Sequence, residues 1–164
     1  MSYRHGSMLR KDEDMESYKN LDQMIQEVCE NEDMDLNQVF DMPEDNRERI
    51  QRTEALLNLE FPEDFRHFLL KYGSGGMGSF TFMGIEAGKE DERTFTLVLV
   101  TLKYRDQGLP EYLAVIEYEG DFVTCINCED GSIVTWSWFG KKEVCKTSDS
   151  FEAYFMEKLE DYLV

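Results

Sequence analysis

The glycine-rich run GSGGMG, at residues 73–78, divides the chain into two parts with different hydrophobic periods. Before the run, apolar residues recur every three or four positions, as in amphipathic helices. After it, short β-branched and aromatic stretches alternate with Gly and Asp turns, which is typical of hairpins. A chain of 164 residues fits one domain. We therefore expect a single α+β domain in which a mainly antiparallel (mixed) β-sheet packs against several α-helices.

The part before the glycines predicts three helices, at residues 14–30, 43–58 and 62–72. Pro43 and Pro62 suit the start of the second and third helices, because proline lacks the N–H that stays unpaired there. The position of Gly73 is that of a glycine cap at a helix end. A fourth amphipathic helix is expected in the C-terminal stretch SFEAYFMEKLEDYLV.

The part after the glycines predicts four strands, at residues 80–85, 113–119, 122–127 and 132–138. Gly120 and Asp121 form one tight turn between strands, and Asp130 with Gly131 forms another. The segment at residues 95–105 is ambiguous. Its β-branched residues favour a strand, although its apolar spacing also fits a helix.

The glycine run itself has the spelling of a dinucleotide-binding loop, G-x-G-x-x-G. Such a loop follows a strand and opens a helix, because the helix N-terminus holds the pyrophosphate. Here a predicted helix comes first and a predicted strand follows. No Gly-Lys-Ser/Thr sequence is present, so the run is not a Walker loop. We interpret the glycines as a helix cap with a flexible turn, and expect no nucleotide cofactor.

A set of apolar, acidic and glycine residues in the first half and a Trp in the second half form a recognisable pattern. They are Ile50, Glu54, Leu57, Phe61, Pro62, Phe65, Phe68, Leu69, Tyr72, Gly73 and Trp136. This set resembles the signature of the SUKH superfamily, which contains the cell-wall-assembly regulator and many bacterial toxin-immunity proteins. The later stretch LAVIEYEGDFVTCINCEDGSIVTW resembles the second half of the family pattern, which ends near a Trp.

The resemblance extends from about residue 47 to 163 and departs from the pattern at three places. Phe61 replaces a Leu, the Asn before Gly73 is missing, and Cys128 stands near a common Asp. The resemblance implies that residues 14–164 form one SUKH-like domain, with an N-terminal helix and an acidic loop at 14–42. It also implies that residues 95–105 are helical. Residues 1–13 are expected to be disordered or vector-derived.

The charge of the chain limits its partners. It contains 35 acidic and 17 basic residues, for a formal net charge of −18. Such a surface repels nucleic acid and anionic lipid and attracts basic proteins. No apolar run is long enough for a membrane span, and no secretory signal is visible. Four cysteines without such a signal favour reduced thiols and a cytoplasmic protein.

Three motifs could hold a metal ion or a catalytic group, and we favour a structural interpretation of each. DMDLNQVFDMPE (residues 33–44) has the acidic spacing of a calcium loop, but Gln38 occupies the position of the turn glycine. Cys125 and Cys128 lack a second pair, so we expect no metal site. His67 has no evident nucleophile beside it and is expected to be solvated. We therefore expect a protein that is not an enzyme, with no cofactor.

The resemblance and the charge together favour an immunity protein. Its partner would be the C-terminal domain of a cognate polymorphic toxin, a basic nuclease domain that it binds and neutralises. Two alternatives remain: a regulatory scaffold of the cell-wall type, and a small hydrolase that uses the acidic loops. A binding surface needs carboxylates beside aromatic anchors on hairpins and loops. We expect Trp136 in the core, carboxylates that face solvent, and a mobile acidic loop at 90–92. The predicted toxin-binding residues are Glu90, Asp91, Glu92, Glu117, Tyr118, Glu119, Asp121, Glu129, Asp130 and Trp138.

Overall fold

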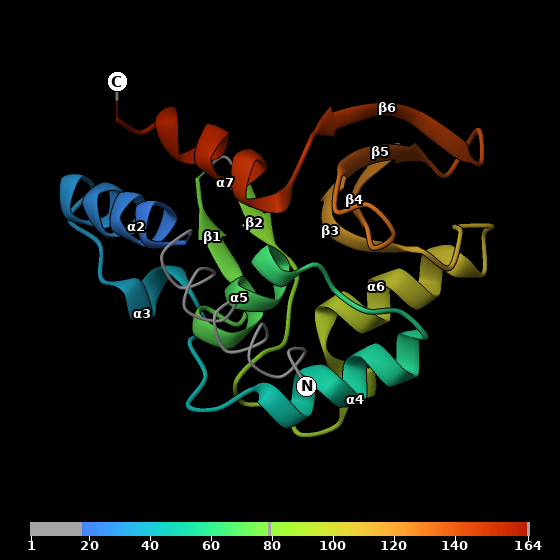
Figure 1. Ribbon diagram of the computed structural model, residues 1–164, viewed down its shortest axis with the longest axis horizontal. Helices are drawn as coiled ribbons and strands as arrows, with labels where there is room; N and C mark the ends of the chain where they lie inside the picture. Colours follow the sequence, from blue (N-terminus) through green and yellow to red (C-terminus); the bar gives the residue numbers. More distant parts are fainter. Residues whose placement is uncertain (1–17, 79, 164) are drawn as a thin grey trace, which may run out of the picture.

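The computed structural model describes residues 18–78 and 80–163, and it has the expected single-domain α+β fold (Figure 1). A two-stranded sheet and a four-stranded sheet lie among the helices, and both sheets are antiparallel. The expectation for residues 1–13 lies outside the described residues.

Helices dominate the N-terminal part, as predicted. They are α2 (Lys19–Asn31), the short α3 (Leu36–Val39), α4 (Arg47–Leu57) and α5 (Glu63–Lys71). Helix α5 begins directly after Pro62, and Gly73 ends it in a left-handed conformation, with its N–H donating to the carbonyl of Phe68 at 3.1 Å. Both end signals were read correctly from the sequence.

The prediction that α4 begins at Pro43 was wrong. The chain before α4 is extended, because Phe40 forms a bridge to Gly75 and the N–H of Asp41 donates to the carbonyl of Ser74 at 2.9 Å. The helix starts only at Arg47, after Asn46, whose buried amide donates to the carbonyl of Leu69 at 2.8 Å. This tertiary pairing holds the segment out of the helical region.

The glycine run is a hairpin rather than a flexible turn. Strand β1 (Gly75–Met77) pairs with β2 (Phe80–Phe82). A Cβ at Gly73 would overlap the carbonyl oxygen of Asp41, and one at Gly75 would overlap that of Val39. The glycines therefore allow the α3–α4 connection to lie directly on the hairpin backbone. The order of helix, glycines and strand is confirmed.

The second half of the chain adds the 3-10 turn η1 (Glu92–Thr94), helix α6 (Thr96–Arg105) and a meander of four strands. The SUKH resemblance therefore predicted the helix at residues 95–105 correctly, whereas the composition of this segment wrongly favoured a strand. The side chains of Leu97, Val98, Thr101 and Tyr104 form one buried face, so burial overrides local propensity. The strands are β3 (Leu113–Glu119), β4 (Phe122–Asn127), β5 (Ile133–Ser137) and β6 (Lys142–Ser148).

Strand β6 was not predicted. Its sequence KEVCKTS is polar and almost wholly exposed, and β6 is an edge strand of the four-stranded sheet. The chain then enters α7 (Phe151–Glu160), the expected C-terminal helix, which Ser150 caps. In Figure 1, α7 lies beside the β1–β2 hairpin, and α6 lies under the four-stranded sheet.

The core has two parts. The larger part surrounds Phe68 of α5, whose ring contacts those of Phe65, Phe82, Phe151 and Phe155. The smaller part lies between α6 and the four-stranded sheet, and contains Tyr104, Val115, Cys125 and Trp136. Trp136 is only 1 % exposed, so its predicted core position is confirmed.

Candidate partner-binding site

The predicted toxin-binding residues do not form one surface. The structure distributes them over the β3–β4 and β5–β6 hairpin ends, the loop before α6 and the β4–β5 turn, and it buries one of them. Because β3 to β6 form a meander, the β3–β4 and β4–β5 turns lie at opposite ends of the sheet. No single partner side chain can contact all three places.

The expectation that the Glu117 carboxylate faces solvent was wrong. A β-bulge between Val115 and Glu117 shifts the alternation of β3, so that Glu117 lies opposite Thr124 and is 4 % exposed. Its carboxylate accepts a hydrogen bond from the hydroxyl of Tyr154 on α7. Glu117 therefore joins the sheet to α7 and is not available at the surface.

The ends of the β3–β4 and β5–β6 hairpins carry exposed aromatic side chains. Tyr118 is exposed, Trp138 is half-buried, and the indole N–H of Trp138 donates to the carbonyl of Gly120 at 3.3 Å, which joins the two ends. Asp121 is exposed beside them. Phe139, the most exposed aromatic side chain among the described residues, follows β5 with 82 % exposure and was not predicted from the sequence.

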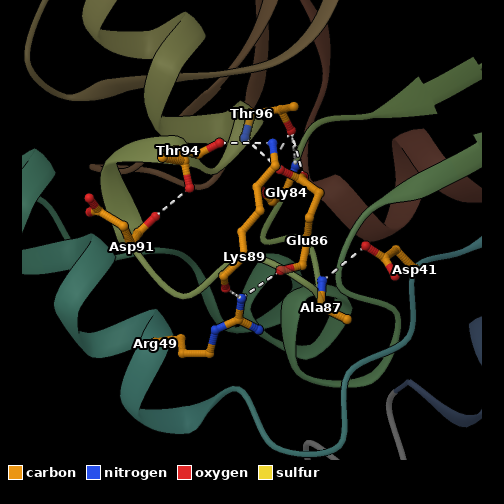
Figure 2. A network of polar contacts seen from close by, with 9 residues as sticks. All are labelled: Asp41, Arg49, Gly84, Glu86, Ala87, Lys89, Asp91, Thr94 and Thr96. Carbon is orange, nitrogen blue, oxygen red and sulfur yellow. Dashed lines mark hydrogen bonds and ion pairs between the residues drawn. The ribbon is translucent and has the colours of Figure 1, made fainter.

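The loop that contains Glu90, Asp91 and Glu92 was expected to be mobile, but a polar network fixes it (Figure 2). The guanidinium of Arg49, on α4, donates to the carbonyls of Glu86 and Lys89 and stacks on the ring of Phe95 at 4.8 Å. The ammonium of Lys89 donates to the carboxylate of Glu86 at 3.1 Å. The loop is thus held by buried or half-buried groups that the sequence reading did not identify.

Two of the three acidic residues of this loop have structural partners. The Asp91 carboxylate caps η1 by accepting from the N–H of Arg93 at 3.0 Å. Glu92 lies 3.5 Å from the side chain of Arg52. Glu90 is exposed. The loop therefore offers a smaller free negative charge than its sequence implies.

The β4–β5 turn carries Glu129 and Asp130, both exposed. The Asp130 carboxylate accepts from the N–H and the hydroxyl of Ser132, at 2.9 and 2.6 Å, and these bonds hold its pKa below the usual value. Asp130 shapes the turn, while the side chain of Glu129 extends from it toward a groove.

That groove has a volume of about 770 Å³. It lies between the C-terminal half of α4, the α4–α5 connection, the segment before β3 and the β4–β5 turn. Two of its lining residues were named from the sequence: Glu54 as a residue of the family signature and Glu129 as a toxin-binding residue. The lining residues are Gln51, Glu54, Ala55, Asn58, Leu59, Glu60, Glu111, Tyr112, Cys128 and Glu129.

The carboxylates around the groove affect the groups beneath them. Burial, reinforced by the Glu54 carboxylate, raises the pKa of Cys128 to about 12, so its thiol stays protonated and unreactive. Burial and the carboxylates of Glu143, Glu129 and Asp130 raise the pKa of Tyr112. The groove is thus an electronegative surface with neutral side chains in its floor.

Comparison with known proteins places this architecture in a family. A family model described as SUKH_5, SMI1-KNR4 cell-wall, matches residues 11–160. The chain belongs to the SUKH family of SMI1-KNR4 proteins. A crystal structure of a protein from Pseudomonas syringae pv. tomato is also similar, with a TM-score of 0.59 and 22 % identity over 74 % of this chain and 86 % of that chain. At this identity the likeness is one of fold.

The residues that carry the SUKH resemblance have structural roles in this protein. The carboxylate of Glu54 accepts from the N–H of Phe61 at 2.7 Å and from Arg66 at 2.5 Å, which fixes the α4–α5 connection. Pro62 and Gly73 bound α5. The remaining signature side chains are buried in the core: Ile50, Leu57, Phe65, Phe68, Leu69, Tyr72 and Trp136.

His67 is not simply solvated in this SUKH protein, so that interpretation was wrong. Its Nε2 lies 3.0 Å from the carboxylate of Asp22, and its ring stacks on Tyr18 at 4.7 Å. The same carboxylate accepts from the hydroxyl of Tyr72 at 2.7 Å and from Lys71 at 3.1 Å. This cluster attaches α2 to α5.

The acidic loop at residues 33–44 also has a structural arrangement. Asp35 caps α3, and the Gln38 side chain accepts from the backbone N–H of Asp35 at 3.1 Å, which completes a capping box. Cys125 lies in β4, and Cys128 lies just beyond its end. Across residues 18–78 and 80–163, no three His, Cys, Asp or Glu side chains are grouped as a metal ion would require. No helix in the described part is both long and apolar enough to cross a membrane.

Proposed function

We propose that this SUKH protein is a bacterial immunity protein that binds the basic C-terminal domain of a cognate polymorphic toxin, a nuclease, and blocks its substrate groove. The observation that carries the proposal is the excess of acidic side chains on a SUKH fold, with a net charge of −18. A nuclease lines its groove with Lys and Arg to hold phosphates, and an acidic protein can occupy that groove in their place.

The proposal is for a binding protein and not for an enzyme. The SUKH family is not a known enzyme family. Exposed aromatic side chains, among them Tyr118 and Phe139, are available as anchors beside the acidic positions. We propose that the protein acts in the cytoplasm, where a nuclease that enters or is made in the cell would meet its substrate.

The test is neutralisation. The toxin domain encoded beside this gene should kill cells when expressed alone and should be tolerated when this protein is co-expressed. In vitro, the association rate should fall steeply between low and physiological salt, because long-range steering is screened. If no neighbouring toxin domain is bound or neutralised, the immunity function is refuted.

A regulatory role is the second candidate, because the matching family model is described by the cell-wall proteins SMI1 and KNR4. It predicts that affinity capture from the native host yields enzymes or regulators of wall assembly instead of a nuclease. Deletion of the gene would then alter wall composition in cells that encode no toxin.

A further inference from the structure

Three exposed acidic side chains line the groove beside α4. Glu60 lies in the α4–α5 connection, Glu111 before β3, and Glu129 in the β4–β5 turn, and all three are exposed. Within the described residues, none of them forms an ion pair within 4.0 Å. By contrast, Glu54 in the same groove is engaged by Arg66.

The C-terminal end of α4 adds to the negative potential of the groove. Ala55 and Asn58, from its last turn and cap, line the groove, and no basic residue lies in that last turn. The N–H groups of Asn58 and Leu59 pair with the carbonyls of Ala55 and Glu54, and the negative end of the helix dipole that remains there favours a cation. Helices α5, α6 and α7 each have a Lys in the last turn, whereas α4 has no basic residue there.

The floor of the groove is less polar than its walls. Leu59 and Cys128 pack against the larger core and Tyr112 against the smaller one, yet all three also line the groove. An aliphatic stem can lie on such a floor while its charged head reaches the carboxylates above. A small inorganic cation would make no use of this floor.

We propose that this groove seats a Lys- or Arg-bearing segment of a basic protein partner. One basic side chain would lie along Leu59 and Tyr112, with its cation among Glu60, Glu111 and Glu129. The inference rests on the proposed function, since it identifies the partner's contact as basic. It assigns that contact to the groove rather than to the hairpin ends or the 86–96 loop.

The first experiment uses a short oligoarginine peptide that carries one tryptophan, so it does not depend on identifying the toxin. Peptide titration followed by amide NMR shifts should perturb residues 54–60, 111–112 and 128–129 first. The triple variant Glu60→Gln, Glu111→Gln, Glu129→Gln should lower the affinity at least tenfold. A charge-matched triple at exposed positions elsewhere, Glu27→Gln, Glu44→Gln, Glu157→Gln, should lower it less than threefold.

The same two triples then test the toxin domain. Both remove three negative charges, so long-range steering falls equally, and only the groove triple should raise the dissociation rate. Carbodiimide coupling of the wild-type complex should link groove carboxylates to toxin lysines. Because the substituted side chains are exposed, both triples should melt at the wild-type temperature.

The outcomes separate the two proposals. Equal effects of the two triples on the peptide and on the toxin would overturn the groove assignment, while leaving an immunity function intact. Peptide binding that maps to the hairpin ends would do the same. A toxin domain that binds neither wild type nor variants would refute the function, while the peptide result would still decide whether the groove accepts a basic segment.

Discussion

Replacement of Gly73 by alanine tests whether the glycine run is structural. Gly73 has a φ of +75°, and a Cβ there would overlap the carbonyl oxygen of Asp41 and lie 3.1 Å from that of Ile85. Both obstacles are backbone atoms, so no side-chain rotation can relieve them. Gly73→Ala therefore forces a non-glycine residue into a left-handed conformation and places its Cβ against the backbone of two other segments.

The magnitude follows from two terms. The left-handed conformation of a non-glycine residue costs about 1–2 kcal/mol. Separation of the packed segments adds a further loss of about 1–3 kcal/mol, the usual penalty for overpacking. Gly73→Ala should thus lower the free energy of unfolding by about 2–5 kcal/mol, a large part of the about 5–15 kcal/mol of a typical domain.

Two other glycines separate these terms. Gly120 has a φ of +60° with no atom within 4 Å of a Cβ, so Gly120→Ala should show the conformational cost alone, about 1 kcal/mol. Gly88 has no such φ and equally open surroundings, so Gly88→Ala should be neutral or stabilise by up to about 1 kcal/mol. Urea unfolding followed by tryptophan fluorescence reports the differences, because Trp136 is buried. If Gly73→Ala were no more destabilising than Gly120→Ala, the close backbone approach would not be a determinant of stability.

Three further predictions follow from titratable groups and thiols. Burial and the neighbouring Asp64 raise the pKa of Glu152 above its ordinary 4.5, so ionisation of Glu152 disfavours the folded state. In urea titrations, Glu152→Gln should therefore stabilise the protein at pH 7 by less than about 1 kcal/mol and have no effect below pH 4.5. Burial works to raise the pKa of Asp22, but hydrogen bonds from His67, Tyr72 and Lys71 outweigh it and hold the pKa below 3.8. Asp22→Asn should therefore cost about 1–2 kcal/mol at pH 7, measured in the same way, and the difference should shrink as the pH falls below 3.8. Ellman's reagent should label exposed Cys145 rapidly and the other three thiols only after unfolding, because burial raises the pKa values of Cys29, Cys125 and Cys128.

Much of the fold could be predicted because burial is periodic in the sequence. The stripe of Phe65, Phe68 and Leu69 defines α5, and Asp130 with Gly131 defines a hairpin turn. The helix at residues 95–105 could not be obtained from propensity, since its β-branched residues are those of a strand. There the family resemblance decided between the strand that propensity favours and the helix that the apolar spacing also fits.

Errors arose where contacts from distant segments decide the conformation. Pairing of Phe40 with Gly75 delays the start of α4, and a bulge in β3 turns Glu117 inward. Strand β6 has no hydrophobic alternation, because it forms only through hydrogen bonds to β5 at the edge of the sheet. Local pattern reading has no access to any of these three effects.

The groove illustrates the same limit for function. Glu60, Glu111 and Glu129 are separated by 51 and 18 positions in a chain with 35 acidic residues, and only Glu129 was among the residues predicted from the sequence to bind a partner. What distinguishes them is that none forms an ion pair within 4.0 Å in the described structure and that they line a groove at the end of α4, since a carboxylate already engaged by an arginine contributes little to a new partner. The sequence reading chose acids beside aromatic residues in the chain, and the fold placed several of them in caps and turns. Acidic residues that stabilise the fold and acidic residues that remain available for a partner therefore differ in their spatial neighbours. That difference makes the groove a stronger candidate for the partner-binding site than the acidic residues that lie beside aromatic residues in the sequence.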